Sequence, residues 1–322
     1  MKKFLSVLLS VVLLFGSSFV TSAYTENKVI RLSNDAIDFI TSKNKTISYN
    51  AIPLYDYNED IIAYGYNLLP EGYVICDING NIIECSFENM KKFDEEKNYY
   101  VGPTVLSNKI SDLNMVAKSL RFSDKVKRVS QREYNINTLS EQTNSTRSVS
   151  YRVLSGNLRL YNYNPDGICG STAAAIFFMY YNDYIDDYMV LSSYETSDGE
   201  ELILLLEPHI DGDEPGSNTS DLVSGMNWYL RWKGRSGYYT AVSSNSVAYS
   251  TYQNIINSGR PAIVDLDEHP DYQEHWVVGY GYEKYVRSDR SYNYYIVNDG
   301  GGNRGVYILS DYVGDIAYLN HL

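Results

Sequence analysis

Cys169 is the residue whose surroundings best suit a chemical role. Residues 165–168 before it contain a proline and a glycine, and residues 172–181 after it form an Ala-rich apolar run. The proline and glycine predict a turn and the apolar run predicts a buried helix, so we expect the thiol at a helix N-terminus. The helix dipole and the free N–H groups there stabilise a thiolate, which is the nucleophilic form of cysteine. The alternative is an inert thiol packed in a core.

A thiolate nucleophile needs a general base, and the chain has 4 histidines. His275 opens an apolar, β-type run at 276–282. A histidine at the start of a buried strand can be held rigidly, as a general base must be; the alternative is a half-buried structural histidine. His209 and His269 fall in acidic, loop-like segments and His321 is the penultimate residue, where chains fray, so we expect no catalytic role for them.

A third group should orient the imidazole ring. A strand-like run ends at Asn298 and Asp299, and a glycine-rich segment follows. Either side chain can accept the imidazole Nδ1–H and fix the tautomer; the alternative is a glycine-rich turn with solvated polar residues. Asn162 and Asn164 are the amide side chains upstream of the cysteine. Either amide, together with the Cys169 backbone N–H, is a candidate to bind the oxyanion of an acyl-transfer intermediate.

The elements that must position these residues divide by charge near residue 150. Residues 24–149 hold about 15 basic and 17 acidic side chains, whereas residues 150–322 hold about 10 and 23. A segment at 135–150 is rich in Asn, Thr, Ser and Gln, and its Arg147 offers a protease a cutting site. The sequence therefore predicts a first domain at 24–134, a linker at 135–150 and a second domain at 151–322; the alternative is one permanent unit with a surface loop.

The first domain contains a predicted hairpin. Two β-rich runs, at 72–76 and 82–86, flank an Asn-Gly pair that favours a tight turn. Cys76 and Cys85 lie nearly symmetrically about that turn. A disulfide across the strands and two unpaired structural thiols are both open.

Residues 1–23 have the layout of a secretory signal peptide. Two lysines precede an apolar run at 4–20, and small residues for cleavage stand at 21–23. Glycine and serine interrupt the apolar run, which is barely long enough to span a bilayer, so cleavage is favoured over a membrane anchor. We expect a secreted, extracellular protein with no membrane association after cleavage.

Composition and charge exclude several classes of function. The net charge of −13 repels phosphate backbones, so no nucleic-acid partner is expected. The second domain has no cysteine pair and only scattered histidines, and Asp211, Asp213 and Asp221 lack the spacing of a calcium loop, so no metal is expected. The glycines at 300–302 lack the lysine and helix of a phosphate loop, and no cofactor is expected.

The motifs in their order resemble papain-like (clan CA) cysteine peptidases. The resemblance lies in Cys169-Gly170-Ser171 opening a helix, in the His-Trp-Val-Val-Gly-Tyr-Gly run at 275–281 and in the Asn298-Asp299 pair. It extends to secreted bacterial types, including streptopain and the peptidases related to double-glycine leader-processing enzymes. It implies an α+β fold, in which a helical part carries the cysteine and an antiparallel sheet carries the histidine and its Asn/Asp partner.

The resemblance also implies an activity. The first domain resembles the inhibitory propeptide of streptopain-type enzymes, through residues 53–55 and 72–75. The expected protein is a secreted cysteine endopeptidase made as a zymogen, with protein or peptide substrates and its own propeptide-like domain as partners. Two rival functions are a catalytically inactive, Tyr-rich binding module of the same fold and a Cys/His amidase that acts on cell-wall peptide.

The chain departs from the papain pattern at two places. Papain-like enzymes have a glutamine six residues before the nucleophile, where this chain has Tyr163, so Asn164 replaces it as the expected oxyanion donor. Asn298 aligns with the residue that orients the histidine in papain. The leader-processing group uses an aspartate, which favours Asp299.

Overall fold

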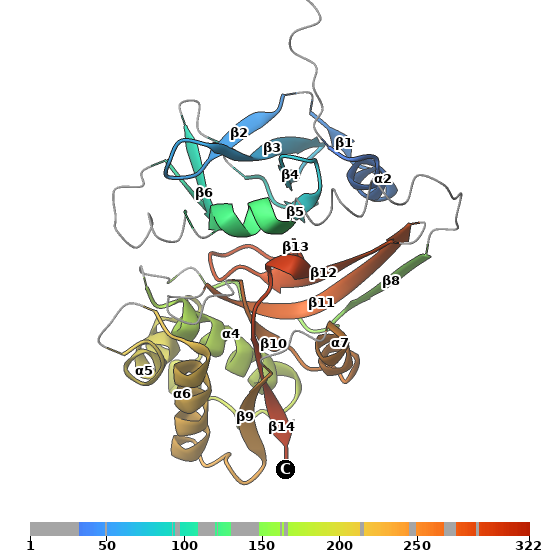
Figure 1. Ribbon diagram of the computed structural model, residues 1–322. Helices are drawn as coiled ribbons and strands as arrows, with labels where there is room; N and C mark the ends of the chain where they lie inside the picture. Colours follow the sequence, from blue (N-terminus) through green and yellow to red (C-terminus); the bar gives the residue numbers. More distant parts are fainter. Residues whose placement is uncertain are drawn as a thin grey trace, which may run out of the picture.

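The computed structural model describes residues 32–322 except 49, 92, 94–96, 109–119, 121, 130–147, 162, 164–166, 213–215, 245–248, 267–274 and 288–289. The predictions on the signal peptide, Arg147, Asn164 and His269 lie outside these residues. The fold is mixed α+β, as predicted, with one large sheet (Figure 1). In the part of the chain described, no helix is long and apolar enough to cross a membrane.

The N-terminal unit, which we define as residues 32–129, is mostly antiparallel sheet. Its helix α2 (Asn34–Ser42) begins at Ser33, whose Oγ accepts the N–H of Ala36 (3.2 Å), and buries Phe39 and Ile40. A second helical stretch spans 122–129. The strands are β1 (Thr46–Ile47), β2 (Ile52–Tyr55), β3 (Ile61–Leu69), β4 (Tyr73–Asp77), β5 (Ile82–Ser86), β6 (Asn98–Gly102) and β7 (Val105–Ser107).

The predicted hairpin is confirmed as β4 and β5, but its two cysteines do not face each other. The Asp77 carboxylate accepts the N–H groups of Asn79 and Asn81 (both 2.9 Å) and so shapes the turn. The strands shift register next to Cys76, which pairs with Ile82, while Cys85 pairs with Val74. Neither cysteine forms a disulfide and both are buried, so the disulfide alternative is wrong.

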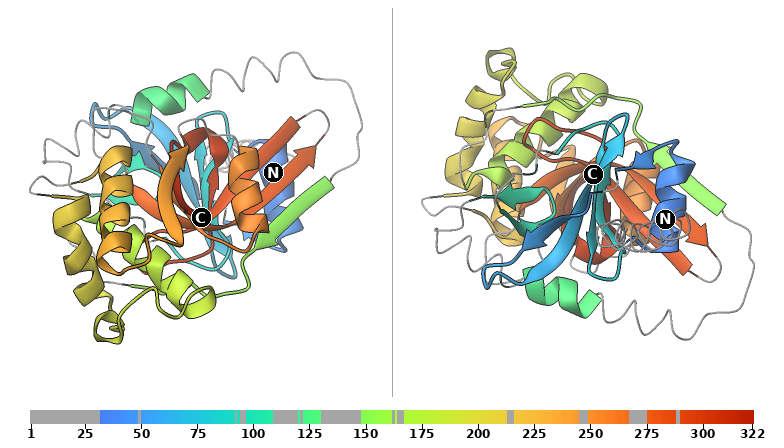
Figure 2. Two further views of the ribbon diagram at one scale, coloured as in Figure 1. Left: turned by 90° about the horizontal axis from the view of Figure 1, so that it is seen from below. Right: turned by 90° about the horizontal axis from the view of Figure 1, so that it is seen from above.

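The C-terminal unit, residues 148–322, places helices around the rest of the sheet. Its helices are α4 (Cys169–Tyr184), α5 (Glu200–Ile210), α6 (Thr219–Trp232) and α7 (Tyr249–Asn257), with short 3-10 turns at Ser192–Tyr194 and Ser310–Tyr312. Its strands are β8 (Ser148–Val153), β9 (Tyr239–Ser244), β10 (Ala262–Asp265), β11 (Trp276–Arg287), β12 (Arg290–Asn298), β13 (Val306–Leu309) and β14 (Ile316–His321). Helices α5 and α6 lie at the left of both views in Figure 2. Because α4 packs against α5, α6, β10 and β11, almost its whole surface is apolar and buried.

One sheet runs through both units. The strand order is β7-β6-β2-β3-β4-β5-β13-β12-β11-β10-β14-β9, with β1 on β3 and β8 on β11. The units meet where β5 pairs antiparallel with β13, in the register Val306↔Ser86, Tyr307↔Cys85 and Ile308↔Glu84. Residues 148–150, expected in the linker, instead begin β8. The units therefore share backbone hydrogen bonds as well as a core.

Two histidines expected in irregular segments are ordered. His209 lies in the last turn of α5, although it follows Pro208, and its ring stacks on Trp228 (3.4 Å between centroids). The apolar face of α5 keeps the helix intact to Ile210. His321 lies in β14 and pairs with Tyr239 of β9. β14 is hydrogen-bonded to β10 on its other side. The loop at His209 and the fraying at His321 were therefore wrong predictions.

Candidate active site

Helix α4 begins at Cys169, as the sequence predicts. Gly167 has φ of 90°, a left-handed turn conformation, and Ile168 occupies the N-cap position. Cys169 is partly exposed. Cys85, by contrast, is fully buried, and desolvation raises the pKa of its thiol well above the ordinary value. Only the helix-start cysteine therefore combines access with a position that favours a thiolate.

His275 directly precedes β11, as predicted, and the ladder between β10 and β11 extends to it. Asp265 pairs with Trp276, and the carbonyl of His275 accepts the N–H of Leu266 (3.1 Å). This ladder fixes the backbone of His275, whose side chain is half-buried. A base on such a rigid backbone keeps its position during a reaction.

Ser217 connects the cysteine helix to the histidine strand. Its carbonyl accepts the indole N–H of the buried Trp276 (2.9 Å), the residue after His275. A Cβ atom added to Gly170, the residue after Cys169, would lie 2.2 Å from Ser217 Oγ. The N–H of Gly216 also donates to the carbonyl of Gly167 (2.8 Å), just before α4. One short segment thus contacts the immediate neighbours of both candidate residues and brings them into one region.

Asn298 is the last residue of β12, and its side chain is fully buried. Its Nδ2 donates to the carbonyl of Arg159 (3.0 Å), and its Oδ1 accepts the N–H of Gly300 (3.0 Å). Asn298 pairs with Val278 and therefore shares its face of the sheet. His275 precedes Val278 by three residues, so strand alternation places its side chain on the opposite face.

Asp299 directly follows β12, and alternation continued past both strand ends would give it the same face as His275. Its Oδ1 accepts the N–H groups of Gly301 (2.8 Å) and Asn303 (2.9 Å), and its Oδ2 accepts Asn303 Nδ2 (2.7 Å). These bonds fix the carboxylate over the glycine-rich turn. An ionised carboxylate has about four acceptor positions, so it can take an imidazole N–H as well.

A pocket of about 210 Å³ lies beside this turn, between the two units. The N-terminal unit contributes Phe87 and Glu88, and the C-terminal unit contributes Tyr280 and Arg304 together with residues 156–158. Asn89 Nδ2 donates to the carbonyl of Arg304 (2.5 Å) at its edge. The N-terminal unit therefore covers the turn that carries Asp299.

Sequence reasoning missed two residues of this region, Asp211 and Ser217. Asp211 was considered only as a calcium ligand, and it instead accepts hydrogen bonds from Ser171 in the first turn of α4. The sequence signal was an aspartate followed by glycine at the end of an apolar helix, which does not reveal its distant partner. Among the residues described, no group of three or more His, Cys, Asp or Glu side chains could hold a metal ion.

The sequence of the C-terminal unit matches a family model. Residues 155–313 match the sequence model of the Peptidase_C39 like family, and this range contains Cys169, His275, Asn298 and Asp299. A solved structure from Bacillus anthracis, named as a C39-like peptidase, is 15% identical with a TM-score of 0.33, over 52% of this chain and 96% of that one. The comparison with curated proteins gives no match. The family match indicates a cysteine peptidase, so the predicted resemblance is confirmed at that level.

Proposed function

We propose that this chain is a secreted cysteine endopeptidase in which Cys169 is the nucleophile, His275 the general base and Asp299 the group that orients the imidazole. The observation that carries the proposal is the Ser217 segment, which contacts the start of α4 and the start of β11 together. A nucleophile and a base from distant parts of the chain need such a common support to stay in reach of each other.

The chemistry follows from these roles. His275 takes the thiol proton, and the Cys169 sulfur attacks the carbonyl carbon of the peptide bond. The tetrahedral intermediate then collapses: the C–N bond breaks, and the imidazolium gives its proton to the leaving amine. Water, deprotonated by the same imidazole, hydrolyses the thioester and returns the free thiol. A helix N-terminus favours negative charge, so the start of α4 would stabilise the oxyanion.

The preference for Asp299 over Asn298 rests on their surroundings. The amide of Asn298 uses its oxygen and its nitrogen within the C-terminal unit, on the face away from His275. The carboxylate of Asp299 is fixed by three donors, and strand alternation continued by one residue would put it on the histidine's face. A carboxylate also stabilises the imidazolium that forms during catalysis, which an amide does only weakly.

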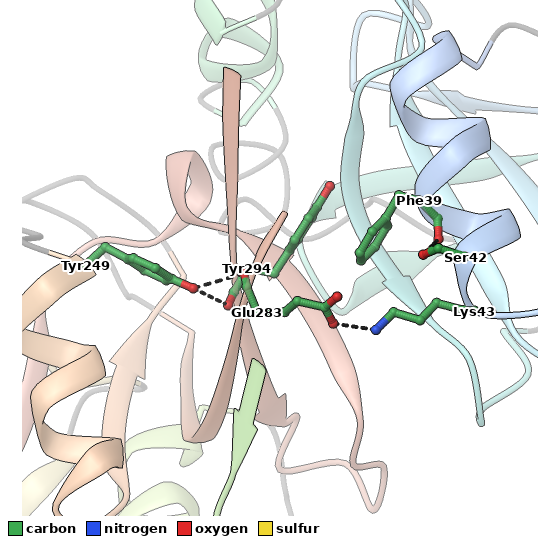
Figure 3. Close-up of polar contacts among 6 residues, drawn as sticks. All are labelled: Phe39, Ser42, Lys43, Tyr249, Glu283 and Tyr294. Carbon is green, nitrogen blue, oxygen red and sulfur yellow. Dashed lines mark hydrogen bonds and ion pairs between the residues drawn. The ribbon is translucent and has the colours of Figure 1, made fainter. Parts of the chain in front are cut away.

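We further propose that the N-terminal unit is a docked inhibitor. Its contacts with the C-terminal unit include the β5–β13 pairing, the Asn89–Arg304 contact by the Asp299 turn, and a polar contact toward the far end of β11. At that end Lys43 Nζ lies 2.5 Å from Glu283 Oε2, as Figure 3 shows. The Tyr292 hydroxyl also donates to Asp35 (2.6 Å). Occupation of the face beside the site would keep substrate away.

The Lys43 contact is built to be specific. The Glu283 side chain is 1% exposed, so its charge depends on a partner. The ammonium of Lys43 also lies 5.3–5.8 Å from the centres of four aromatic rings, an arrangement that favours a cation. Those rings belong to Phe39, Phe87, Tyr151 and Tyr307. Both units supply them, which supports a dedicated docking contact.

The proposal is tested with the secreted chain after proteolytic cleavage within residues 135–150 and with a Cys169→Ala variant cleaved in the same way, each incubated with a denatured protein and with purified cell wall. We expect new protein fragments from the wild type only, because Cys169 supplies the attacking sulfur. Fragments from the variant would remove Cys169 as nucleophile. Release of cell-wall peptide without cleavage of protein would point to the amidase, and no product from either substrate, with a thiol that resists alkylation, would point to the binding module.

A further inference from the structure

Helix α4 begins without a side-chain cap of its own. Ile168, at the N-cap position, has no side-chain oxygen with which to accept an N–H, and the first turn carries no acidic residue. The first N–H groups of a helix lack partners within the helix and need acceptors from elsewhere. For the helix that begins at the candidate nucleophile, the source of those acceptors matters to the chemistry.

Asp211 supplies an acceptor from another element. It lies at the C-cap of α5, and its Oδ2 accepts the backbone N–H of Ser171 (3.0 Å) and the hydroxyl of the same residue. The Asp211 side chain is buried, at 6% exposure, so water screens its charge only weakly. Burial raises the pKa of this carboxyl, and the hydrogen bonds from Ser171 oppose that rise.

The same carboxylate belongs to the support between cysteine and histidine. A Cβ atom on Gly170 would lie 2.8 Å from Asp211 Oδ1 as well as 2.2 Å from Ser217 Oγ. Only a glycine allows the helix to approach both groups this closely. Asp211 thus fixes the first turn of α4 against the segment that holds Trp276, the neighbour of His275.

We propose that Asp211 is a positioning residue for Cys169, which caps α4 from outside and, as a buried negative charge in the first helical turn, raises the pH at which the thiol ionises. The inference rests on the proposed role of Cys169. Among the described residues, the titratable groups near this region include Glu207 on α5, which acts on Asp211 electrostatically, and His275 before β11. Like charges close together disfavour joint ionisation, so removal of the Asp211 charge should favour the thiolate.

The test is a pH titration of the thiolate ultraviolet absorbance in the full chain. Each protein is compared with its own Cys169→Ser counterpart, so that the absorbance of the tyrosines and of Cys76 and Cys85 is subtracted. We expect Asp211→Asn, which keeps an acceptor oxygen, to move the midpoint to lower pH by roughly half a unit or more. The matched control is Asp221→Asn, which removes the same charge from the capping box of α6 and should leave the midpoint in place.

An unchanged or higher midpoint in Asp211→Asn would overturn the inference. If that variant does not fold, Ser171→Ala decides the question. It retains the carboxylate and the backbone N–H bond but removes the hydroxyl, whose dipole partly offsets the negative charge, so it should shift the midpoint to higher pH by a smaller amount; no shift, or a shift to lower pH, overturns the inference. The readout needs no peptide hydrolysis, so an inactive protein that shows the shift would refute the proposed function and leave this inference standing.

Discussion

At the scale of single residues, the neighbours Asn298 and Asp299 differ in what surrounds them. Asn298 is fully buried and joins the Arg159 carbonyl to the Gly300 amide. Asp299 is partly exposed and holds the following turn. The amide therefore serves the structure of the strand end, whereas the carboxylate holds the glycine-rich turn and keeps acceptor positions for a further donor.

We expect Asp299→Ala to lower kcat by roughly 10²- to 10⁴-fold, because the imidazole loses its orienting acceptor. Asn298→Ala should instead lower the free energy of unfolding by about 1–3 kcal/mol, since it leaves a buried donor and acceptor unpaired. Initial rates on a peptide substrate and urea unfolding of both variants measure the two effects. An inactive but fully stable Asn298→Ala protein would reverse the assignment.

His275→Ala should be inactive, because a neutral thiol beside no base is a poor nucleophile. His209→Ala and His269→Ala should retain activity. His209 stacks on Trp228, so its loss should act on stability alone. The rates of the three variants on one substrate check this, and an inactive His269→Ala protein with an active His275→Ala protein would make the choice of base wrong.

The sequence predicted Cys169 and His275 because each begins a strongly patterned apolar run. It could not predict Asp211, because its partner Ser171 is 40 residues away and nothing in the intervening residues marks the contact. The choice between Asn298 and Asp299 also needed the cross-strand register, which strand alternation alone does not supply. Local patterns thus find residues that start elements, and they miss residues that join elements.

At the scale of elements, the first turn of α4 is crowded from outside. Gly170→Ala would place a methyl group 2.2 Å from Ser217 Oγ, 2.8 Å from Asp211 Oδ1 and 2.9 Å from Ile210 Cγ2. Two separate segments would have to move, at a cost of about 1–3 kcal/mol. The higher helix propensity of alanine offsets about 1 kcal/mol of this cost at most. The substitution should therefore destabilise the folded protein.

We therefore expect Gly170→Ala to lower the melting temperature and to reduce kcat, because the start of α4 shifts relative to His275. The control is Gly237→Ala, where no described atom lies within 4 Å of the added methyl group. Differential scanning calorimetry and peptide hydrolysis measure both variants. Equal melting temperatures for the two would show that the α4 start tolerates a side chain.

Element types were more predictable than element partners. The hairpin of β4 and β5 and the helix after Cys169 were expected from turn signals and apolar runs. The pairing of β5 with β13 joins residues more than 200 positions apart and has no local signal. The last turn of α5 was not predicted, because a proline such as Pro208 usually ends a helix. The packing of the apolar face of α5 outweighs that preference.

At the scale of the whole molecule, the Lys43–Glu283 ion pair joins the two units. Lys43→Ala should weaken docking by about 3 kcal/mol, because it leaves the Glu283 carboxylate buried without its partner. If the N-terminal unit is an inhibitor, the uncleaved variant should hydrolyse peptide faster than the uncleaved wild type. Initial rates on uncleaved chains, confirmed intact by mass spectrometry, measure this.

The matched control is Lys97→Ala. Lys97 pairs with Glu59 within the N-terminal unit, where the Glu59 side chain is 67% exposed. Solvent screens that pair, so its loss should change neither docking nor rate appreciably. Equal rates for Lys43→Ala and the wild type, with measurable separation of the units, would show that the N-terminal unit does not inhibit.

Strand β13 carries a further consequence for a protein that sheds its N-terminal unit. β13 pairs with β12 on one side and with β5 on the other. Release of the N-terminal unit would therefore leave the backbone of residues 306–308 without hydrogen-bond partners on the β5 side. All three side chains are buried in the joined molecule. An unprotected apolar edge is a template for any extended chain it meets, including a second copy. The released C-terminal unit should therefore tend to self-associate through this edge, and it should lose activity faster at higher protein concentration.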